Sequence, residues 1–500
     1  MTKYRLLMLT TLMISGCSIC YELIISAVSS YLMGDSTLQY SITIGLYMSA
    51  MGLGSYLSKY VKNHLFNWFA LIEMGVGLIG GTSALVLFYA NLYLDTYQLV
   101  MYAEIILIGT LVGLEIPLLT RIIEDDNENL RVTLSSIFSF DYIGGLVGSI
   151  AFPLLLLPQL GYFATAFLTG CMNIAAAVLI IFKYAPRIRK VQIYKTAVLA
   201  LLLLMTMGML FSEDISNHVE DGLYRDKVIL SEQTRYQHIV MTRHKDDLRL
   251  YIDGNVQFCS LDEYRYHEAL VHIPMSAVAK RNKVLILGGG DGLAVRELLK
   301  YEEPRITLVD LDEQMISICR EDPNIAALNE GSLDSDRLTV VTQDAYQYLE
   351  ETEEKFDVII VDLPDPNNEA LNKLYTNVFY RLCKQALTED GVMTVQSTSP
   401  YYAPEAFWCI HDTLKSEGFQ VKPYHLQVPA FGDWGFQLAS KKELKGEIQF
   451  TVDTRYLSEE NVEALFMFGK DELPQGKIRI NSLSRPALMQ YYAKAVRDWE

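Results

Sequence analysis

Long apolar stretches fill the first part of the chain and constrain its fold more than any other feature. A helix that crosses a membrane needs roughly 20 mostly apolar residues. Seven stretches meet this requirement: Leu6–Met33, Gln39–Lys59, Phe66–Tyr89, Gln98–Ile123, Val132–Leu157, Tyr162–Phe182 and Tyr194–Phe211. We therefore predict an N-terminal α-helical membrane bundle of about seven spans over residues 1–212, in contact with the lipid bilayer.

Acidic residues within these predicted spans raise two possibilities. The residues are Glu22, Glu73, Glu104, Glu115 and Asp141. Ionisable groups in hydrocarbon are costly, so they usually face the interior of a bundle. They could form a binding site or path for a polycation such as a polyamine; the commoner role is a protonated or hydrogen-bonded acid in a polar helix contact. Beside Asp141, Gly144, Gly145 and Gly148 predict a face where helices pack closely.

The net charge changes at the same point of the chain as the hydropathy, after residue 212. Residues 1–212 contain 11 Lys and Arg and 11 Asp and Glu, so the formal net charge of −18 falls on the rest of the chain. An acidic domain disfavours a nucleic-acid partner and suits cationic ligands, although acidic surfaces also serve solubility. We expect no nucleic-acid partner.

The hydrophobic period changes twice after residue 212. Residues 213–275 contain the runs KVILSEQT, QHIVMTRH and LRLYIDGNVQF, which predict a small β-strand lid. Residues 276–442 alternate five hydrophobic strands with helices, which predicts an α/β, Rossmann-like domain with a parallel, doubly wound sheet. Residues 443–500 form a C-terminal extension that the pattern leaves unassigned.

A glycine-rich turn, GGGDG at Gly288–Gly292, follows the first predicted strand of the α/β domain. Its glycines, Gly288 and Gly290 among them, let backbone approach a ligand, and the following helix offers free N–H groups. Asp310 ends the next strand about 20 residues on, where an acid holds ribose hydroxyls. Asp344 ends the third strand, a position suited to an adenine amino group. Because parallel strands end at one edge, we expect a nucleoside-binding crevice there.

Asp291, inside the glycine turn, separates two classes of cosubstrate. An S-adenosylmethionine methyltransferase must accept the methionine carboxylate, which an acid in this turn would repel. A decarboxylated ligand presents only an ammonium there, and Asp291 would attract it. The turn therefore favours a decarboxylated cosubstrate.

The fourth strand ends in DLPDP, which places Asp362 and Asp365 three residues apart. A primary ammonium has a pKa of about 10, so it must lose a proton before it attacks. One carboxylate can accept that proton while the other holds a diamine; the alternative is a structural Asx-Pro turn. Upstream, Tyr266 and His267 lie at the junction of lid and core, where a lone histidine is more often a satisfied core residue.

These motifs resemble, in order, those of the polyamine aminopropyltransferases, the spermidine synthase family. The resemblance covers about Tyr236–Ser440 through IDGNVQ, DEYRYHE, GGGDG, LVDLD, QDA, DLPDP and NKLYTNVFY. The segments CYELI, GLEIPLLTR and DYIGGLVGSIAFPLLLLPQLG are similar to a subgroup with a multi-span membrane region. The resemblance implies that decarboxylated S-adenosylmethionine gives its aminopropyl group to an amine, putrescine first, yielding spermidine and methylthioadenosine.

The resemblance also implies residue roles. Catalysis falls to Asp362, as the acid–base residue, and to Tyr266. The residues implied to bind the cosubstrate are Gln237, Gly288, Gly290, Asp291, Asp310, Asp344 and Ala345. The residues implied to bind the amine are His267, Asp291, Asp365, Gln257 and Tyr375. No prosthetic group and no metal is implied, and soluble relatives commonly form homo-oligomers.

The chain departs from the family in three places. Asp310 stands where the family usually has Glu, which alters the reach to the ribose, and Leu363 and Pro364 replace small residues between the two motif acids. Asn367, Asn368 and Glu369 replace a glycine-proline element near the acceptor amine, which leaves the acceptor open. The acceptor could be putrescine, cadaverine, agmatine or spermidine. Two other functions also remain: a membrane-tethered S-adenosylmethionine methyltransferase, and a polyamine transporter or sensor whose soluble domain binds a ligand.

Basic residues between the spans bear on localisation in the cell (inner) membrane. Positive charge collects on the cytoplasmic side, and the charges on one side are Lys3, Arg5, Lys59, Lys62, Arg121, Arg131, Lys183, Arg187, Arg189, Lys190 and Lys195. This predicts an inside N-terminus, from which seven spans would place the catalytic domain outside. Either one stretch does not cross fully, with the last and shortest as the first suspect, or the enzyme works outside the cytosol. Because the implied substrate is made in the cytosol, we favour the cytoplasmic side.

Overall fold

The computed structural model describes residues 5–33, 36–94, 96–124, 130–444, 448–474 and 476–499. Contacts divide the chain into two compact units, Met1–Val228 and Ile229–Glu500, called here the helical unit and the α/β unit. The division differs from the predicted boundary after residue 212. Helix α8 (Ser212–Leu223), which the prediction placed in the lid, packs against α3, α6 and α7 of the helical unit and buries Val219 there.

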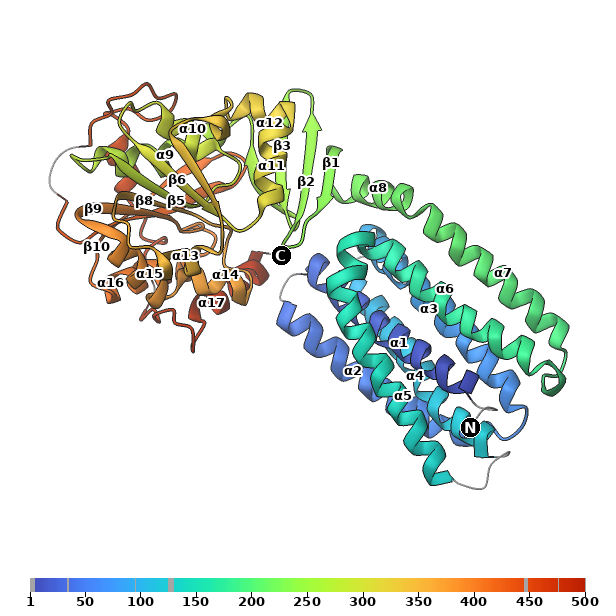
Figure 1. Cartoon of the computed structure of the whole chain (residues 1–500). Helices are drawn as coiled ribbons and strands as arrows, with labels where there is room; N and C mark the ends of the chain where they lie inside the picture. Colours follow the sequence, from blue (N-terminus) through green and yellow to red (C-terminus); the bar gives the residue numbers. More distant parts are fainter. Residues whose placement is uncertain are drawn as a thin grey trace. The chain divides into compact units, whose positions relative to one another are not determined.

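In the described part of the helical unit, long helices correspond to each of the seven apolar stretches (Figure 1). Their bounds are α1 (Arg5–Met33), α2 (Ser36–Leu57), α3 (Leu65–Tyr93), α4 (Tyr97–Glu124), α5 (Leu130–Ala151), α6 (Leu157–Lys183) and α7 (Val191–Leu210). A π-helical turn at Phe152–Leu156 joins α5 to α6. The helical path then breaks at Gly161, where φ is 69° and ψ is −174°.

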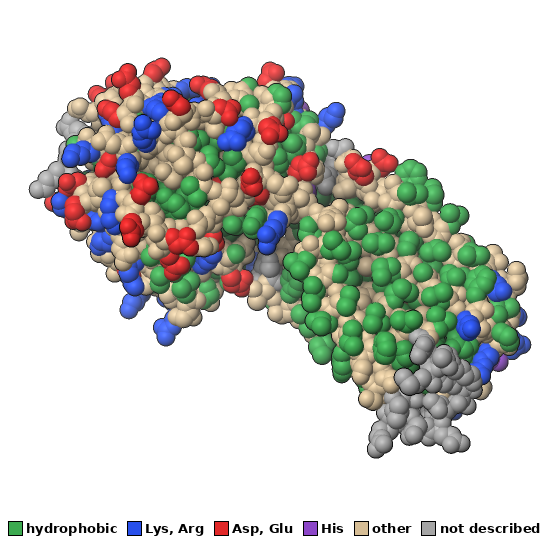
Figure 2. Space-filling view, in the orientation of Figure 1, with side chains coloured by type: hydrophobic (Ala, Val, Ile, Leu, Met, Phe, Trp, Pro, Cys, Tyr) green, Lys and Arg blue, Asp and Glu red, His purple; other side chains and the backbone are tan. Residues whose placement is uncertain are grey.

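Five segments of the described residues are long and apolar enough to cross a membrane: Leu6–Met33, Leu65–Tyr93, Tyr97–Ile123, Leu134–Lys183 and Val191–Leu210. The fourth has 50 residues and contains most of α5 and all of α6. Helix α2, which is rich in Ser and Thr, is not among them, whereas α7, the stretch we suspected, is. Figure 2 shows hydrophobic side chains covering the visible face of these helices, while charges are interspersed over the α/β unit.

The predicted close-packing face on α5 is confirmed for two of its glycines. A Cβ on Gly144 would lie 2.2 Å from the carbonyl oxygen of Leu12, and one on Gly148 would lie 2.4 Å from that of Gly16. Both partners belong to α1. Any larger side chain would push these two helices apart, so the absence of a side chain sets their spacing.

The α/β unit begins with a four-stranded sheet whose order follows the sequence. Its strands are β1 (Lys227–Gln233), β2 (His238–His244), β3 (Asp247–Ile252) and β4 (Asn255–Cys259). The third predicted run is therefore two strands, because the chain reverses at Asp253 and Gly254, which both have positive φ. The sheet ends at Cys259, and the remaining predicted lid residues form α9 (Glu263–Ser276), which packs against the second sheet.

The second sheet has the order β10-β11-β9-β8-β5-β6-β7 in the described residues. Its parallel strands are the five that the sequence predicts: β5 (Lys283–Gly288), β6 (Arg305–Asp310), β7 (Leu338–Thr342), β8 (Phe356–Asp362) and β9 (Leu387–Gln396). Two antiparallel strands, β10 (Gln420–Val428) and β11 (Gly432–Ser440), extend it beyond the prediction. β10 lies at the edge, where Pro423 is tolerated.

Hydrophobic clusters cover both faces of this sheet. Alternate residues of β5 point to opposite faces: Val284 and Ile286 join one cluster, and Leu285 and Leu287 join the other. The helices are α10 (Leu293–Leu299), α11 (Glu313–Glu321), α12 (Pro323–Leu328), α13 (Ala345–Glu351), α14 (Glu369–Asn372), α15 (Asn377–Ala386), α16 (Pro404–Ser416) and α17 (Ala487–Trp499). With parallel strands between two helical layers, the carboxyl ends of β5, β6 and β8 form one edge, where the predicted acids lie.

Candidate active site

The glycine turn after β5 packs against the neighbouring strand ends. Gly288 has φ of 86°, and a Cβ there would lie 2.0 Å from the carbonyl oxygen of Asp362. A Cβ on Gly290 would lie 2.8 Å from Oδ2 of Asp310. Glycine is therefore required at Gly288, and at Gly290 a larger residue would displace the Asp310 carboxylate, so the turn lies directly beside the acids that end β6 and β8.

Asp291 is buried at the start of α10. Its Oδ1 accepts a hydrogen bond from the Leu293 N–H at 2.9 Å. Burial raises the pKa of Asp291 to about 6, although the nearby His267 opposes this shift. Asp291 is thus fixed in the turn as a carboxylate that would favour an ammonium and disfavour another carboxylate.

Asp310 ends β6 and turns toward the glycine loop. It accepts hydrogen bonds from the Gly290 N–H at 3.1 Å and the Asp312 N–H at 2.9 Å. Burial raises the pKa of Asp310 to about 6. Gln237 lies close by, but its Nε2 donates to Oδ2 of Asp312 at 3.0 Å rather than to Asp310.

Asp312 is a residue that sequence reasoning missed. Besides Gln237, it accepts a hydrogen bond from Thr234 Oγ1 at 2.6 Å, and it caps α11 through the Gln314 N–H at 3.1 Å. It therefore joins the segment between β1 and β2 to the end of β6. Its position two residues after Asp310 in LVDLD was the available signal.

Asp344 caps α13, of which buried Ala345 is the first residue. Its Oδ1 accepts from the N–H of Tyr346 at 2.9 Å, and its Oδ2 accepts from Lys373 Nζ at 2.6 Å. Burial alone would raise the pKa of Asp344, but Lys373 and the helix N–H groups hold it below the ordinary value. The ion pair with Lys373 was not expected from the sequence.

Asp362 and Tyr266 form a direct pair. The Tyr266 hydroxyl donates to Oδ1 of Asp362 at 2.6 Å. Burial raises the pKa of Asp362, against the opposing effect of His267, and burial together with Asp362 raises that of Tyr266. The Tyr266 ring also contacts Phe436, at a centroid distance of 5.2 Å, so β11 holds it in place.

His267 belongs to a buried network that the isolated histidine did not suggest. Its Nδ1 lies 2.8 Å from Oε2 of Glu263, and Arg296 donates to both oxygens of Glu263 at 2.8 and 3.0 Å. Burial would lower the pKa of His267, but Glu263 more than offsets this and raises it to about 9. His267 is therefore an imidazolium at neutral pH. The i,i+4 spacing of Glu263 and His267 on α9 was the missed signal.

Asp365 accepts hydrogen bonds from two side chains. It accepts from Gln396 Nε2 at 3.2 Å and from Thr398 Oγ1 at 3.3 Å. Burial raises the pKa of Asp365, and these donors oppose the rise. Nearby, the Tyr375 hydroxyl donates to the Leu363 and Pro364 carbonyls, both at 3.1 Å. Gln396 ends β9, so a polar residue closing the fifth parallel strand was a usable signal.

Gln257 is the predicted site residue that these interactions do not reach. It lies on β4, where its Nε2 donates to the carbonyl oxygen of Asn255 at 3.1 Å. By contrast, Asp291, Asp310 and Asp362 lie close enough to affect one another electrostatically, with His267 beside them. The arrangement can hold a ligand that carries several positive charges.

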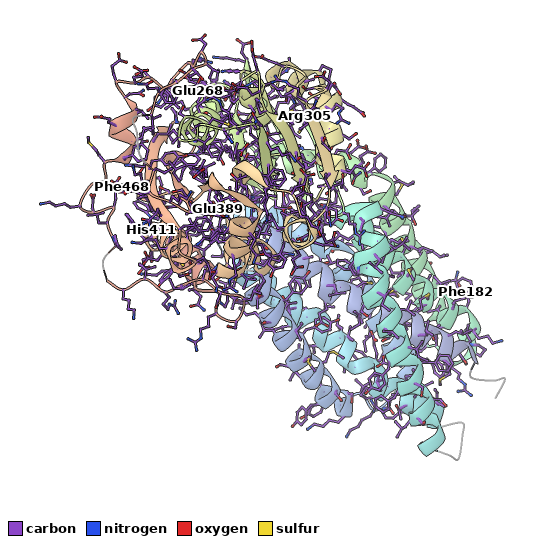
Figure 3. The ribbon with its side chains drawn as sticks, turned by 60° about the vertical axis from the view of Figure 1, so that its left-hand side comes forward. Phe182, Glu268, Arg305, Glu389, His411 and Phe468 are labelled. Atoms are coloured by element: carbon purple, nitrogen blue, oxygen red, sulfur yellow. The ribbon has the colours of Figure 1, made fainter. Side chains whose placement is uncertain are left out.

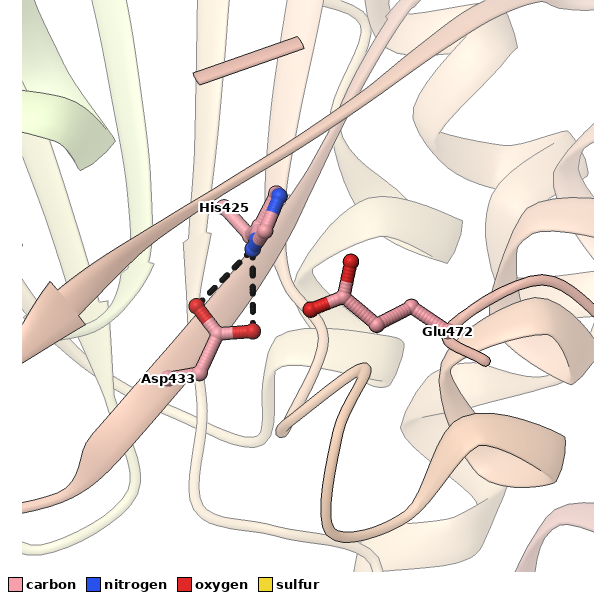
Figure 4. Close-up of side chains that lie close together, drawn as sticks. All are labelled: His425, Asp433 and Glu472. Atoms are coloured by element: carbon pink, nitrogen blue, oxygen red, sulfur yellow. Dashed lines mark hydrogen bonds and ion pairs between the residues drawn. The ribbon is translucent and has the colours of Figure 1, made fainter. Parts of the chain in front are cut away.

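A second cluster resembles a metal centre in composition. Among the described residues, His425, Asp433 and Glu472 offer ligand atoms within 4.8 Å of one another (Figure 4). His425 Nδ1 lies 2.8 and 2.9 Å from the Asp433 oxygens, and its Nε2 lies 2.7 Å from the Met467 carbonyl. Both ring nitrogens face acceptors, so the ring is an imidazolium and has no lone pair for a metal. The cluster is an ion pair between β10 and β11.

Comparisons with known proteins show which family the chain is similar to. A Spermine/spermidine synthase domain matches residues 263–451. The polyamine aminopropyltransferase of Leptospira interrogans is 40% identical over 99% of this chain and 98% of its own length. That of Oceanobacillus iheyensis is 40% identical over 97% of this chain and 96% of its own. A crystal structure of spermidine synthase in complex with the transition state analogue AdoDATO is 30% identical and covers 49% of this chain and 88% of its own, with a TM-score of 0.46.

The matched domain covers the acids at the ends of β5, β6, β7 and β8. The two full-length relatives extend the similarity through both units. Identity of 40% over 99% of the chain exceeds what a shared fold alone would require. The chain is therefore a member of the polyamine aminopropyltransferase family.

Proposed function

We propose that the crevice of the α/β unit transfers the aminopropyl group of decarboxylated S-adenosylmethionine to a diamine, putrescine first, and forms spermidine and methylthioadenosine. The observation that carries this proposal is the position of Asp291 inside the glycine turn, beside Asp362. The carboxylates of Asp291 and Asp362 would attract both the sulfonium and the aminopropyl ammonium of the cosubstrate. A methionine carboxylate would meet Asp291 in a buried site, which disfavours the methyltransferase alternative.

The reaction requires a neutral amine and a positioned electrophile. The amine nitrogen attacks the propyl carbon beside the sulfonium, so a C–N bond forms as the C–S bond breaks. The electron pair of the broken bond passes to sulfur, which becomes the neutral thioether of methylthioadenosine. Asp362 accepts the proton of the attacking ammonium, and Tyr266 orients that carboxylate through its hydrogen bond at 2.6 Å.

The remaining acids bind different parts of the two substrates. We assign Asp310 to the ribose hydroxyls and Asp344 with Ala345 to the adenine, where the adenine amino group would share Asp344 with Lys373. Asp291 holds the aminopropyl ammonium. Asp365 holds the distal ammonium of the diamine, because it ends the same loop as Asp362 and lies beside Tyr375.

A turnover assay with the purified full-length protein tests this function. Decarboxylated S-adenosylmethionine is supplied with putrescine, cadaverine, agmatine or spermidine, and methylthioadenosine release is measured. We expect release that requires an amine and is fastest with putrescine, and no product with S-adenosylmethionine. Release of S-adenosylhomocysteine from the carboxylated compound, with none from the decarboxylated one, would instead establish a methyltransferase.

We also propose that the helical unit lies in the cell membrane as a multi-pass bundle and that the α/β unit faces the cytoplasm. Leu107, Leu154 and Leu203 are exposed hydrophobic residues of this unit. Figure 2 shows hydrophobic side chains over its visible face, which supports a lipid-facing surface. The side of the membrane follows from substrate supply in the cytosol. Protease treatment of intact spheroplasts should spare the α/β unit, and inverted vesicles should expose it; the reverse pattern contradicts the proposed side.

A further inference from the structure

Lys373 joins the segment that follows the DLPDP loop to the end of β7. It is the first residue of the 3₁₀ turn Lys373–Tyr375, and its Nζ donates to Oδ2 of Asp344 at 2.6 Å. The side chain of Lys373 is 37% exposed and that of Asp344 is 27% exposed. The ion pair is therefore accessible to a ligand rather than sealed in the core.

The two oxygens of Asp344 have different partners. Oδ1 accepts from the N–H groups of Tyr346 and Gln347 at 2.9 and 3.2 Å, which caps α13. Oδ2 accepts from Lys373. Because a carboxylate oxygen has about two acceptor positions, the cap occupies Oδ1 and a position remains on Oδ2. A ligand that donates to Asp344 there must lie next to Nζ of Lys373.

The Lys373 ammonium is held from a second side and keeps hydrogen-bonding capacity. Its Nζ lies 5.8 Å from the centroid of the Tyr346 ring, which attracts the charge without using an N–H group. The Tyr346 ring in turn stacks on Phe379 of α15 at a centroid distance of 6.4 Å. Since an ammonium has three donors, Lys373 can bind Asp344 and a ligand at once. Oδ2 of Asp344 and Nζ of Lys373 thus form an acceptor and a donor side by side.

Adenine presents the complementary pattern, because its amino group is a donor and the ring nitrogens on either side of it, N1 and N7, are acceptors. We propose that Asp344 and Lys373 together recognise this edge of the base. Oδ2 of Asp344 accepts from the amino group, and Nζ of Lys373 donates to one of the adjacent ring nitrogens. This inference rests on the proposed function, in which Asp344 binds the adenine of the cosubstrate. Lys373 is thereby a specificity-determining residue for the nucleoside.

Equilibrium binding of methylthioadenosine and its 1-deaza and 7-deaza analogues to the full-length protein tests the inference. Each analogue replaces one ring nitrogen by C–H and keeps the amino group. In the wild type, at least one analogue should bind about 10- to 100-fold more weakly than methylthioadenosine, the effect of one hydrogen bond to a charged group. In Lys373→Met, methylthioadenosine itself should weaken by a similar factor, and the same analogue should bind no more weakly than methylthioadenosine.

Lys283→Met is the matched control. Nζ of Lys283 pairs with Oε2 of Glu354 at 3.0 Å, in another partly exposed ion pair. Lys283 lies at the amino end of β5, in register with Arg305 of β6, which is labelled in Figure 3. This is the opposite end of the strands from the acids of the crevice. Lys283→Met should therefore bind methylthioadenosine and both analogues as the wild type does.

The comparison of analogues separates a contact with the base from a general structural role. Losses of affinity that are the same in the wild type and in Lys373→Met overturn the inference, because Lys373 then contacts no ring nitrogen. A wild type that binds both analogues as tightly as methylthioadenosine also overturns it, even if Lys373→Met does not fold. Either result leaves the proposed function intact. A folded wild type that neither binds nor releases methylthioadenosine removes the proposed function, and the inference with it.

Discussion

Buried acids occur in both units, but they are held in opposite ways. In the α/β crevice, Asp291 and Asp310 each accept hydrogen bonds from backbone N–H groups, and Asp362 accepts one from Tyr266. In the described part of the helical unit, Glu73, Glu104 and Glu115 each keep one buried oxygen without a partner. Hydrogen-bond donors fix the orientation of a carboxylate and so prepare it to bind a ligand. A buried oxygen without a donor has lost its hydration in apolar surroundings, which costs free energy.

The difference indicates where polyamine chemistry takes place. The other oxygen of Glu73 accepts from Asn173 Nδ2 at 2.8 Å, which joins α3 to α6. This is the polar helix contact that the sequence allowed as the commoner role. The crevice acids instead meet at one edge of the sheet with an imidazolium among them. We therefore place catalysis and amine binding in the α/β unit, and packing in the helical unit.

The largest expected effect comes from Asp362→Asn. Loss of a general base costs typically 10²–10⁴-fold in rate, so kcat for methylthioadenosine release should fall within that range. Because the amide retains the shape of the side chain, binding of the cosubstrate should change little. A kcat within about tenfold of the wild type would mean that the amine loses its proton elsewhere.

Asp365→Asn should act mainly on amine binding. An ammonium loses a charge-assisted hydrogen bond worth about 1.5–3 kcal/mol, so KM for putrescine should rise about 10- to 100-fold. The value of kcat at saturating amine should fall much less than in Asp362→Asn. Kinetics in which the two variants lose kcat equally would show that the acids share one role.

Acid pH should weaken binding of the cosubstrate. The pKa values of Asp291 and Asp310 are raised to about 6, so both carboxyls become protonated and lose their negative charge as pH falls through that value. KM for decarboxylated S-adenosylmethionine should therefore rise about tenfold between pH 7 and pH 5. Asp291→Asn should raise KM at neutral pH and leave a shallower acid limb, set by Asp310. A pH-independent KM in the wild type would contradict this assignment.

The smallest expected effect belongs to Glu73→Gln. The amide replaces a buried carboxyl group without changing its shape and keeps a polar contact with Asn173. We expect kcat and KM for putrescine to stay within about twofold of the wild type, since changes away from a site usually add independently. Turnover assays in detergent and in vesicles would check this. A loss of turnover comparable to Asp362→Asn would break the division between the units.

Much of the fold followed from periodicity. The five parallel strands and the helix that starts at Leu293 were predictable, because buried strands read as short β-branched runs and the glycine turn separates strand from helix. Strands β10 and β11 were missed because Pro423, Gly432 and Gly435 resemble loop residues. The two strands pair with each other as a hairpin, but they join the sheet only through β11 and the distant strand β9, which no local pattern contains.

The residues of the candidate site also fall into those that local sequence patterns predict and those that depend on distant contacts. Asp310 and Asp362 could be placed because parallel strands end at one edge of a sheet. The contact of Gln237 with Asp312 and the Lys373–Asp344 ion pair could not, since each joins segments far apart in the chain. Roles for these residues depend on side-chain direction, which periodicity does not determine.

Equilibrium binding of radiolabelled putrescine, in the presence of methylthioadenosine, tests the division between the units most directly. The proteins to compare are the wild type, Asp365→Asn and the double variant Glu73→Gln with Glu115→Gln. We predict one class of site that Asp365→Asn weakens strongly and the double variant leaves intact. Binding that survives Asp365→Asn and disappears in the double variant would place the polyamine site in the helical unit and contradict the account.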